Sequence, residues 1–195
     1  MTHPWHRPAD AMEVGGCRVN IGPEDGGWTF AGLRVWSLGA GERRALPTAG
    51  VETVVLPLSG SFVVEVSIEG THDRYELAGR ADVFSRVTDW AYVPLGASAW
   101  VTSVAGGEVA LPSAVAARKF PAAYVPAEAA RVETRGAGPA TRQVTSFMTP
   151  GVFDGADRLM CVELLTPDGN WSSYPPHRHD GIGDCIVNNE EIYYF

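Results

Sequence analysis

Residues 51–68 have the sequence Val-Glu-Thr-Val-Val-Leu-Pro-Leu-Ser-Gly-Ser-Phe-Val-Val-Glu-Val-Ser-Ile, and this stretch decides the fold class. It is rich in β-branched residues and interrupted at Ser59-Gly60, so it predicts two strands, 51–58 and 61–68, joined by a hairpin turn. Runs of the same kind, separated by Gly, Pro and Asp, predict further strands at 29–36, 91–94, 100–104 and 108–111. Many short strands at regular spacing are typical of a sandwich or a barrel, so the sequence predicts an all-β protein.

The middle of the chain differs in composition from this strand-rich part. Residues 114–140 are rich in Ala, Pro and Gly, which predicts strands and connections between two β-barrels, with one short helix at 127–131. A second β-rich part starts near Arg142, with a predicted strand at 159–165 and a turn at 167–170. We therefore expect residues 1–140 to form a complete barrel and residues 141–195 to form the first part of a second, incomplete barrel.

Composition and charge narrow the class of protein. The chain has 195 residues, of which 45% are hydrophobic, and this is enough for a packed core. Its net charge of -8 disfavours nucleic acid and acidic membranes as partners, but arginines can still hold a small anionic ligand locally. The three cysteines lack C-x-x-C spacing, and no stretch approaches the roughly 18 apolar residues that span a membrane. We expect a cytoplasmic protein without nucleic-acid or membrane partners.

The sequence His177-Arg178-His179 carries the clearest chemical signal. Pro175-Pro176 disfavours a helix before it, and in an extended segment the two imidazoles of an H-x-H motif point to the same side. Two imidazoles and a carboxylate from a neighbouring strand can bind a single divalent metal ion. The alternative is that both histidines are exposed or make ordinary hydrogen bonds.

The acidic pair Glu190-Glu191 is the nearest source of that carboxylate. On a strand the two side chains point to opposite faces, so one would face the histidines, and the alternative is a glutamate pair on the surface. Arg142 is the candidate for binding an anionic substrate through paired hydrogen bonds, with a structural ion pair as the equal alternative. The first barrel has no H-x-H motif, and His72, beside Asp73 in a Gly-containing stretch, is expected to be exposed, so we expect no metal there.

The segment Asn-Trp-Ser-Ser-Tyr-Pro-Pro-His-Arg-His-Asp at 170–180, followed by Glu-Glu-Ile-Tyr-Tyr-Phe at 190–195, resembles the 5-deoxy-glucuronate isomerases of inositol catabolism. Stretches 27–33, 56–60, 91–96 and 141–144 are similar to the same family, so the resemblance covers nearly the whole chain. These enzymes are bicupins, built from two jelly-roll barrels, and are akin to the 4-deoxy-threo-hexulosuronate ketol-isomerases. The resemblance implies a bicupin with a metal-free first barrel and a metal-binding second barrel.

The resemblance also implies roles for the candidate residues. The family pattern of Glu directly before Ile/Val-Tyr selects Glu191 as the third metal ligand beside His177 and His179. Glu190 is then either an outward-facing residue or a partner that supports one of these ligands without contacting the metal. The implied cofactor is a divalent metal, Zn or Mn, with a fourth ligand from a histidine strand that is expected beyond residue 195. Glu191 and Glu190 are then the candidate catalytic carboxylates.

The activity implied by the resemblance is a metal-dependent aldose–ketose isomerisation of a small anionic sugar acid, 5-deoxy-D-glucuronate, to 5-dehydro-2-deoxy-D-gluconate. One alternative is a non-catalytic cupin-like module that binds a sugar or holds a subunit interface in a homo-oligomer. A metal-dependent dioxygenase is a third hypothesis, because the cupin fold supports several chemistries. We expect the 195-residue chain to be C-terminally truncated relative to the family, and to be nearly inactive by itself.

Overall fold

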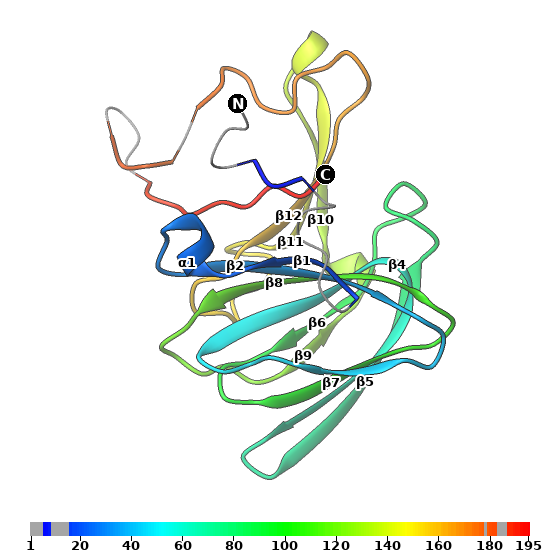
Figure 1. The fold of residues 1–195 in the computed structure, drawn as a ribbon. Helices are drawn as coiled ribbons and strands as arrows, with labels where there is room; N and C mark the ends of the chain where they lie inside the picture. Colours follow the sequence, from blue (N-terminus) through cyan, green and yellow to red (C-terminus); the bar gives the residue numbers. More distant parts are fainter. Residues whose placement is uncertain (1–5, 9–15, 178, 183–186) are drawn as a thin grey trace. The chain divides into compact units, whose positions relative to one another are not determined.

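The computed structural model describes residues 6–8, 16–177, 179–182 and 187–195. Nearly all regular structure in these residues is β-strand (Figure 1), so the predicted all-β fold class is confirmed. The helical segments among them are short: α1 (Pro23–Gly26) and the 3-10 helices η2 (Ala127–Ala129) and η3 (Gly138–Ala140). No helix in this described part is long and apolar enough to cross a membrane.

The chain forms two compact units. The first contains Met1–Ala127 and Gly155–Leu159, and the second contains Glu128–Asp154 and Met160–Phe195. The chain therefore leaves the first unit, returns to it for a short segment and leaves it again. The division into one barrel at 1–140 and part of a second barrel at 141–195 stays a prediction.

The first unit is a nine-stranded antiparallel sheet that folds around one core. Its strands are β1 (Cys17–Ile21), β2 (Ala31–Leu38), β3 (Arg43–Leu46), β4 (Val51–Ile68), β5 (Thr71–Arg80), β6 (Trp90–Val93), β7 (Ser98–Ser103), β8 (Gly107–Val115) and β9 (Ala123–Val125). One path through the sheet runs β1-β2-β8-β4-β6-β9. Off this path, β5 and β7 pair with β4, and β3 pairs with β7.

Strand β4 connects the two parts of this sheet. Its first half pairs with β6 and β8, and its second half pairs with β5 and β7. The side chains that these strands point inward form one apolar core, because alternate residues of a strand face the same side. The wholly buried apolar members of that core include Phe62, Leu77, Leu111, Val55, Val64 and Val101.

The predicted hairpin turn at Ser59-Gly60 is wrong, because β4 continues through these two residues. Gly60 has a φ of 84°, in the region that favours glycine, and a Cβ built there would overlap the main-chain carbonyl oxygen of Gly106. The pairing register of β4 also shifts on both sides of this point. The glycine therefore allows β4 to bend where it passes from one set of partner strands to another. A Ser-Gly pair inside a β-rich run can thus mark such a bend as well as a hairpin turn.

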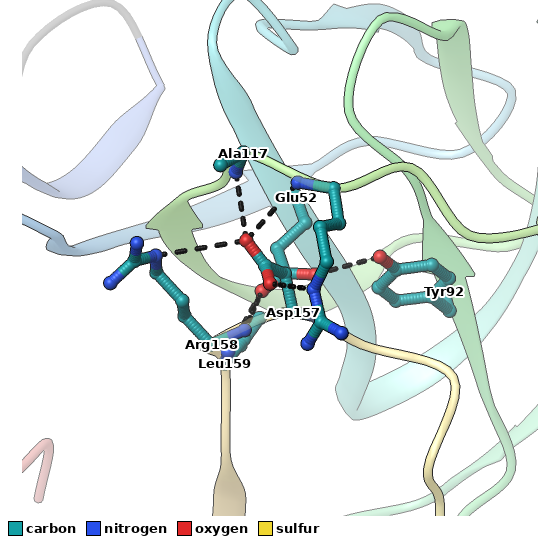
Figure 2. Close-up of polar contacts among 7 residues, drawn as sticks. Glu52, Tyr92, Ala117, Asp157, Arg158 and Leu159 are labelled. Carbon is teal, nitrogen blue, oxygen red and sulfur yellow. Dashed lines mark hydrogen bonds and ion pairs between the residues drawn. The ribbon is translucent and has the colours of Figure 1, made fainter.

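The buried carboxylate of Glu52 binds the segment Gly155–Leu159 to the rest of the first unit (Figure 2). Glu52 lies on β4 and is wholly buried, and its Oε1 accepts hydrogen bonds from the main-chain N–H groups of Arg158 at 2.7 Å and Leu159 at 2.8 Å. Its Oε2 accepts hydrogen bonds from the N–H of Asp157 at 2.8 Å and the hydroxyl of Tyr92 at 2.7 Å. Burial, followed by this contact with Glu52, raises the pKa of Tyr92.

The neighbouring Asp157 makes a second anchor with the loop after β8. Its carboxylate accepts hydrogen bonds from the N–H groups of Ala117 at 2.8 Å and Arg118 at 3.2 Å, and from the Arg118 Nε at 2.7 Å. The Ala117 N–H and the Arg118 guanidinium lower the pKa of Asp157 from 3.8 to about 2. Both acidic side chains thus have donors for their oxygens, as polar groups removed from water require.

The second unit is built on a three-stranded antiparallel sheet of order β10-β11-β12. Its strands are β10 (Arg131–Arg135), β11 (Arg142–Met148) and β12 (Cys161–Leu165), and β12 confirms the strand predicted at 159–165. The predicted turn at 167–170 is also present, since the N–H of Asn170 donates to the carbonyl of Pro167 at 3.0 Å. The next N–H, that of Trp171, donates to Pro139 at 2.7 Å and so fixes the start of the segment that leads to the histidines.

Candidate active site

An open pocket of about 540 Å³ lies in the second unit, between the segment around the two histidines and the last residues of the chain. Aromatic, hydroxyl, imidazole and carboxylate side chains share its wall. The lining residues are Trp171, Ser172, Ser173, Pro176, His177, His179, Asp180, Asn189, Glu191 and Tyr193. This part of the structure therefore combines an apolar surface with groups that can bind hydroxyls, metals or protons.

A short antiparallel pairing brings the two segments of the pocket together. Asp180 forms a β-bridge with Asn188, and this bridge lies between two hydrogen bonds, from Gly181 N–H to Val187 at 3.1 Å and from Asn189 N–H to the carbonyl of His179 at 2.8 Å. The bridge thus holds the segment that carries the two histidines beside the segment that carries Glu191.

The two imidazoles contact each other at the pocket wall. Their ring centroids are 5.0 Å apart, and the rings meet edge to face at 79°. Nδ1 of His177 lies 2.9 Å from the carbonyl oxygen of Pro175. Because a carbonyl only accepts hydrogen bonds, Nδ1 carries the proton in this contact, and a neutral ring then has a lone pair at Nε2.

Glu191 extends into the same pocket with its two oxygens in different surroundings. Oε1 lies 3.8 Å from Nε2 of His179, and Oε2 accepts a hydrogen bond of 2.9 Å from the hydroxyl of Tyr193. Burial, and then the contact with Glu191, raises the pKa of Tyr193, so the phenol stays protonated at neutral pH. Glu190 does not line the pocket as described.

The donor types fit the predicted metal, whereas their spacing is wider than a filled site needs. Two ligands bound to one zinc ion at about 2.1 Å are separated by roughly 3–3.5 Å, somewhat less than the 3.8 Å between His179 and Glu191. Within the residues that the structure describes, no three His, Cys, Asp or Glu side chains are close enough to hold one ion. The predicted ligands His177, His179 and Glu191 therefore share a pocket, and their role as ligands stays a prediction.

Arg142, the predicted substrate anchor, does not line this pocket in the described part of the chain. It begins β11 opposite Arg135, and its Nη1 donates a hydrogen bond of 3.2 Å to the carbonyl of Ala140. Its Nε is buried and has no hydrogen-bond partner among the described residues. Binding of an anionic substrate by Arg142 stays a prediction.

The sequence interpretation did not single out several residues of the pocket. Trp171, Ser172 and Ser173 lie in the stretch 170–180, where the histidine pair is the clearest signal, and Asn189 lies directly before the glutamate pair. Tyr193 could have been found, because residues two apart on an extended segment share a face and Tyr193 is two positions after Glu191.

Comparison with known proteins identifies the family to which nearly the whole chain is similar. A model of the KduI/IolB family matches residues 5–195. The chain belongs to this family. It is 35% identical to the 5-deoxy-glucuronate isomerase of Geobacillus kaustophilus (strain HTA426) over 179 residues, which is 91% of this chain and 61% of that relative. The 5-deoxy-glucuronate isomerase of Geobacillus thermodenitrificans (strain NG80-2) is also 35% identical, over 90% of this chain and 61% of the relative.

A solved structure supports the same grouping. The crystal structure of an IolB-like protein from Salmonella typhimurium LT2 superposes with a TM-score of 0.79 at 29% identity, covering 88% of this chain and 64% of that chain. The KduI/IolB chain described here thus spans about three fifths of the length of the relatives that it matches.

Proposed function

We propose that this KduI/IolB protein is a 5-deoxy-glucuronate isomerase that converts 5-deoxy-D-glucuronate into 5-dehydro-2-deoxy-D-gluconate. Relatives with 35% identity over about nine tenths of this chain carry the isomerase name, and this is the main support. The observation that carries the proposal within the structure is the shared pocket of His177, His179 and Glu191. The proposal concerns the activity of the whole protein, because this chain spans 61% of those relatives.

The proposed reaction is an aldose–ketose isomerisation, in which one proton moves from C2 to C1 and a second moves from the C2 hydroxyl to the aldehyde oxygen, so that the carbonyl shifts from C1 to C2. A divalent metal, Zn or Mn, bound by His177, His179 and Glu191 would polarise the carbonyl and stabilise the negative charge of the enediolate. The contact of His177 Nδ1 with the Pro175 carbonyl orients that ring with Nε2 available for a ligand.

Other residues of the pocket would hold the sugar acid. The exposed ring of Trp171 offers an apolar surface to the carbon face of a sugar, and the hydroxyls of Ser172 and Ser173 are suited to bind its hydroxyl groups. A carboxylate close to the substrate would move the proton, and Glu191 lies in the pocket, whereas Glu190 does not line it. Arg142 does not line the described pocket, and its contact with the acid group stays a prediction from the sequence.

The experiment that tests this function is a turnover assay on the complete protein with 5-deoxy-D-glucuronate, followed by NMR detection of the ketose product. We expect product formation that stops with a chelator and returns with added Zn²⁺ or Mn²⁺. D-glucuronate, which has an additional hydroxyl at C5, serves as the control for substrate identity. Absence of turnover with every added metal would contradict the proposal, and sugar binding without turnover would support the non-catalytic module instead.

A further inference from the structure

Tyr193 lines the pocket, and the proposed isomerisation assigns it no role. Its hydroxyl donates a hydrogen bond of 2.9 Å to Oε2 of Glu191. Its ring stacks on that of Phe195, with centroids 6.4 Å apart and planes at 14°. The ring contact and the hydrogen bond together limit where the hydroxyl can lie.

The hydrogen bond makes the two oxygens of Glu191 different. Oε2 is engaged by Tyr193, whereas Oε1 lies 3.8 Å from Nε2 of His179. A glutamate side chain has three rotatable bonds and is otherwise free to turn either oxygen toward a neighbour. The Tyr193 hydroxyl therefore selects one orientation of the carboxylate, with Oε1 on the side of the histidine.

Carboxylates that bind metals commonly need a second hydrogen bond of this kind, because it fixes the ligand before the metal arrives. The protonated phenol is suited to this role, since it donates one hydrogen bond and brings no charge into the site. The spacing of two residues between Glu191 and Tyr193 puts both side chains on one face of an extended segment, so the pair is built locally.

We propose that Tyr193 is a positioning residue of the metal site, whose hydroxyl holds Oε2 of Glu191 so that Oε1 is presented beside His179 as a single-oxygen ligand. This inference rests on the proposed function, because it assigns Glu191 to the metal. It goes beyond that function in naming the residue that orients the ligand and the oxygen that binds.

The test compares Tyr193→Phe with the matched control Tyr194→Phe in the complete protein, with Co²⁺ as the probe. Tyr194 is the next residue and does not line the described pocket. Calorimetric titration should show Co²⁺ affinity reduced about tenfold or more by Tyr193→Phe, and an altered Co²⁺ absorption spectrum. Tyr194→Phe should match the wild type in both measurements, and thermal melts should show that both variants are folded.

A double variant separates positioning from a general effect on the fold. Adding Tyr193→Phe to Glu191→Gln should cause no further loss of Co²⁺ affinity, because the hydroxyl acts through that carboxylate. Equal affinities and spectra for Tyr193→Phe and the wild type would overturn the inference. A wild-type protein that binds Co²⁺ in a Tyr193-dependent way but does not isomerise the sugar would overturn the proposed reaction and keep the positioning role, whereas no Co²⁺ binding at all would overturn both.

Discussion

Oε1 of Glu52 accepts a hydrogen bond of 2.8 Å from the main-chain N–H of Leu159, a residue 107 positions further along the chain. Two preceding N–H groups, those of Asp157 and Arg158, donate to the same buried carboxylate. Three successive main-chain donors around one anion form a strong, charge-assisted arrangement. These hydrogen bonds tie the segment Gly155–Leu159 to strand β4 of the first unit.

Glu52→Gln should destabilise the first unit by about 2–4 kcal/mol, because an amide NH₂ group would replace one acceptor oxygen and face buried donors. Urea unfolding measures the loss, and amide exchange at 157–159 should become faster. Glu65→Gln is the control, since Glu65 forms an exposed ion pair with Arg43, and it should cost less than about 1 kcal/mol. Similar losses from both variants would show that the buried contacts add nothing.

Asp157 should make the stability of the protein depend on acid pH. Its pKa falls from 3.8 to about 2 in the folded state, so its contribution is complete above about pH 4 and is lost as the pH falls through about 2. Asp157→Asn should remove this part of the pH dependence. Arg118→Met should keep some of it, because the Ala117 N–H remains and is the larger cause. Melting temperatures between pH 2 and pH 5 measure the effect, and identical curves for Asp157→Asn and the wild type would contradict it.

Gly60→Ala tests the bend in β4. Alanine there must adopt a φ of 84° and place its Cβ against the Gly106 carbonyl, so we expect a loss of about 3 kcal/mol or more. Gly70→Ala is the matched control, because Gly70 has a φ of 85° but nothing lies within 4 Å of an added Cβ. That variant should lose only about 1 kcal/mol in chemical unfolding. If the two glycines tolerate alanine equally, the close approach at Gly60 is not what requires glycine.

The prediction of the fold from sequence succeeded where the signal is local. The β-branched composition gave the strands, and Pro167 to Asn170 gave a turn, because these preferences act between near neighbours. The sequence does not predict the continuity of β4, because a Ser-Gly pair is equally suited to a hairpin turn and to a bend with a close contact. The role of Glu52 cannot be predicted from local sequence, since its three main-chain donors, at 157–159, are more than 100 residues away.

In the candidate site, too, local sequence signals are predictive and long-range pairing is not. The H-x-H spacing and the glutamate pair pointed to His177, His179 and Glu191, and these three residues share one pocket. Which glutamate faces that pocket depends on the register of the pairing at Asp180, and spacing alone does not fix a register across a loop of this length. The charge of Arg142 favours an anion-binding role, yet its position opposite Arg135 at the start of β11 follows from strand pairing, which its charge does not predict.

The glutamate pair can be compared directly. Glu191→Gln should weaken Co²⁺ or Zn²⁺ affinity by at least about tenfold, because an amide is a poorer ligand than a carboxylate. Glu190→Gln should cause a smaller loss, since Glu190 does not line the described pocket. Parallel calorimetric titrations provide the comparison. A larger loss from Glu190→Gln would mean that the pairing register is different in the metal-bound protein.

The measurement that tests the central claim most directly is the metal content and turnover of His177→Ala beside those of His72→Ala in the complete protein. His72 is an exposed histidine of the first unit, with its Nδ1 2.8 Å from the hydroxyl of Ser67, and it controls for the loss of an imidazole. We predict that His177→Ala loses bound metal and isomerisation of 5-deoxy-D-glucuronate, whereas His72→Ala retains both. Equal losses from the two variants, or full metal content in His177→Ala, would contradict the assignment of the site.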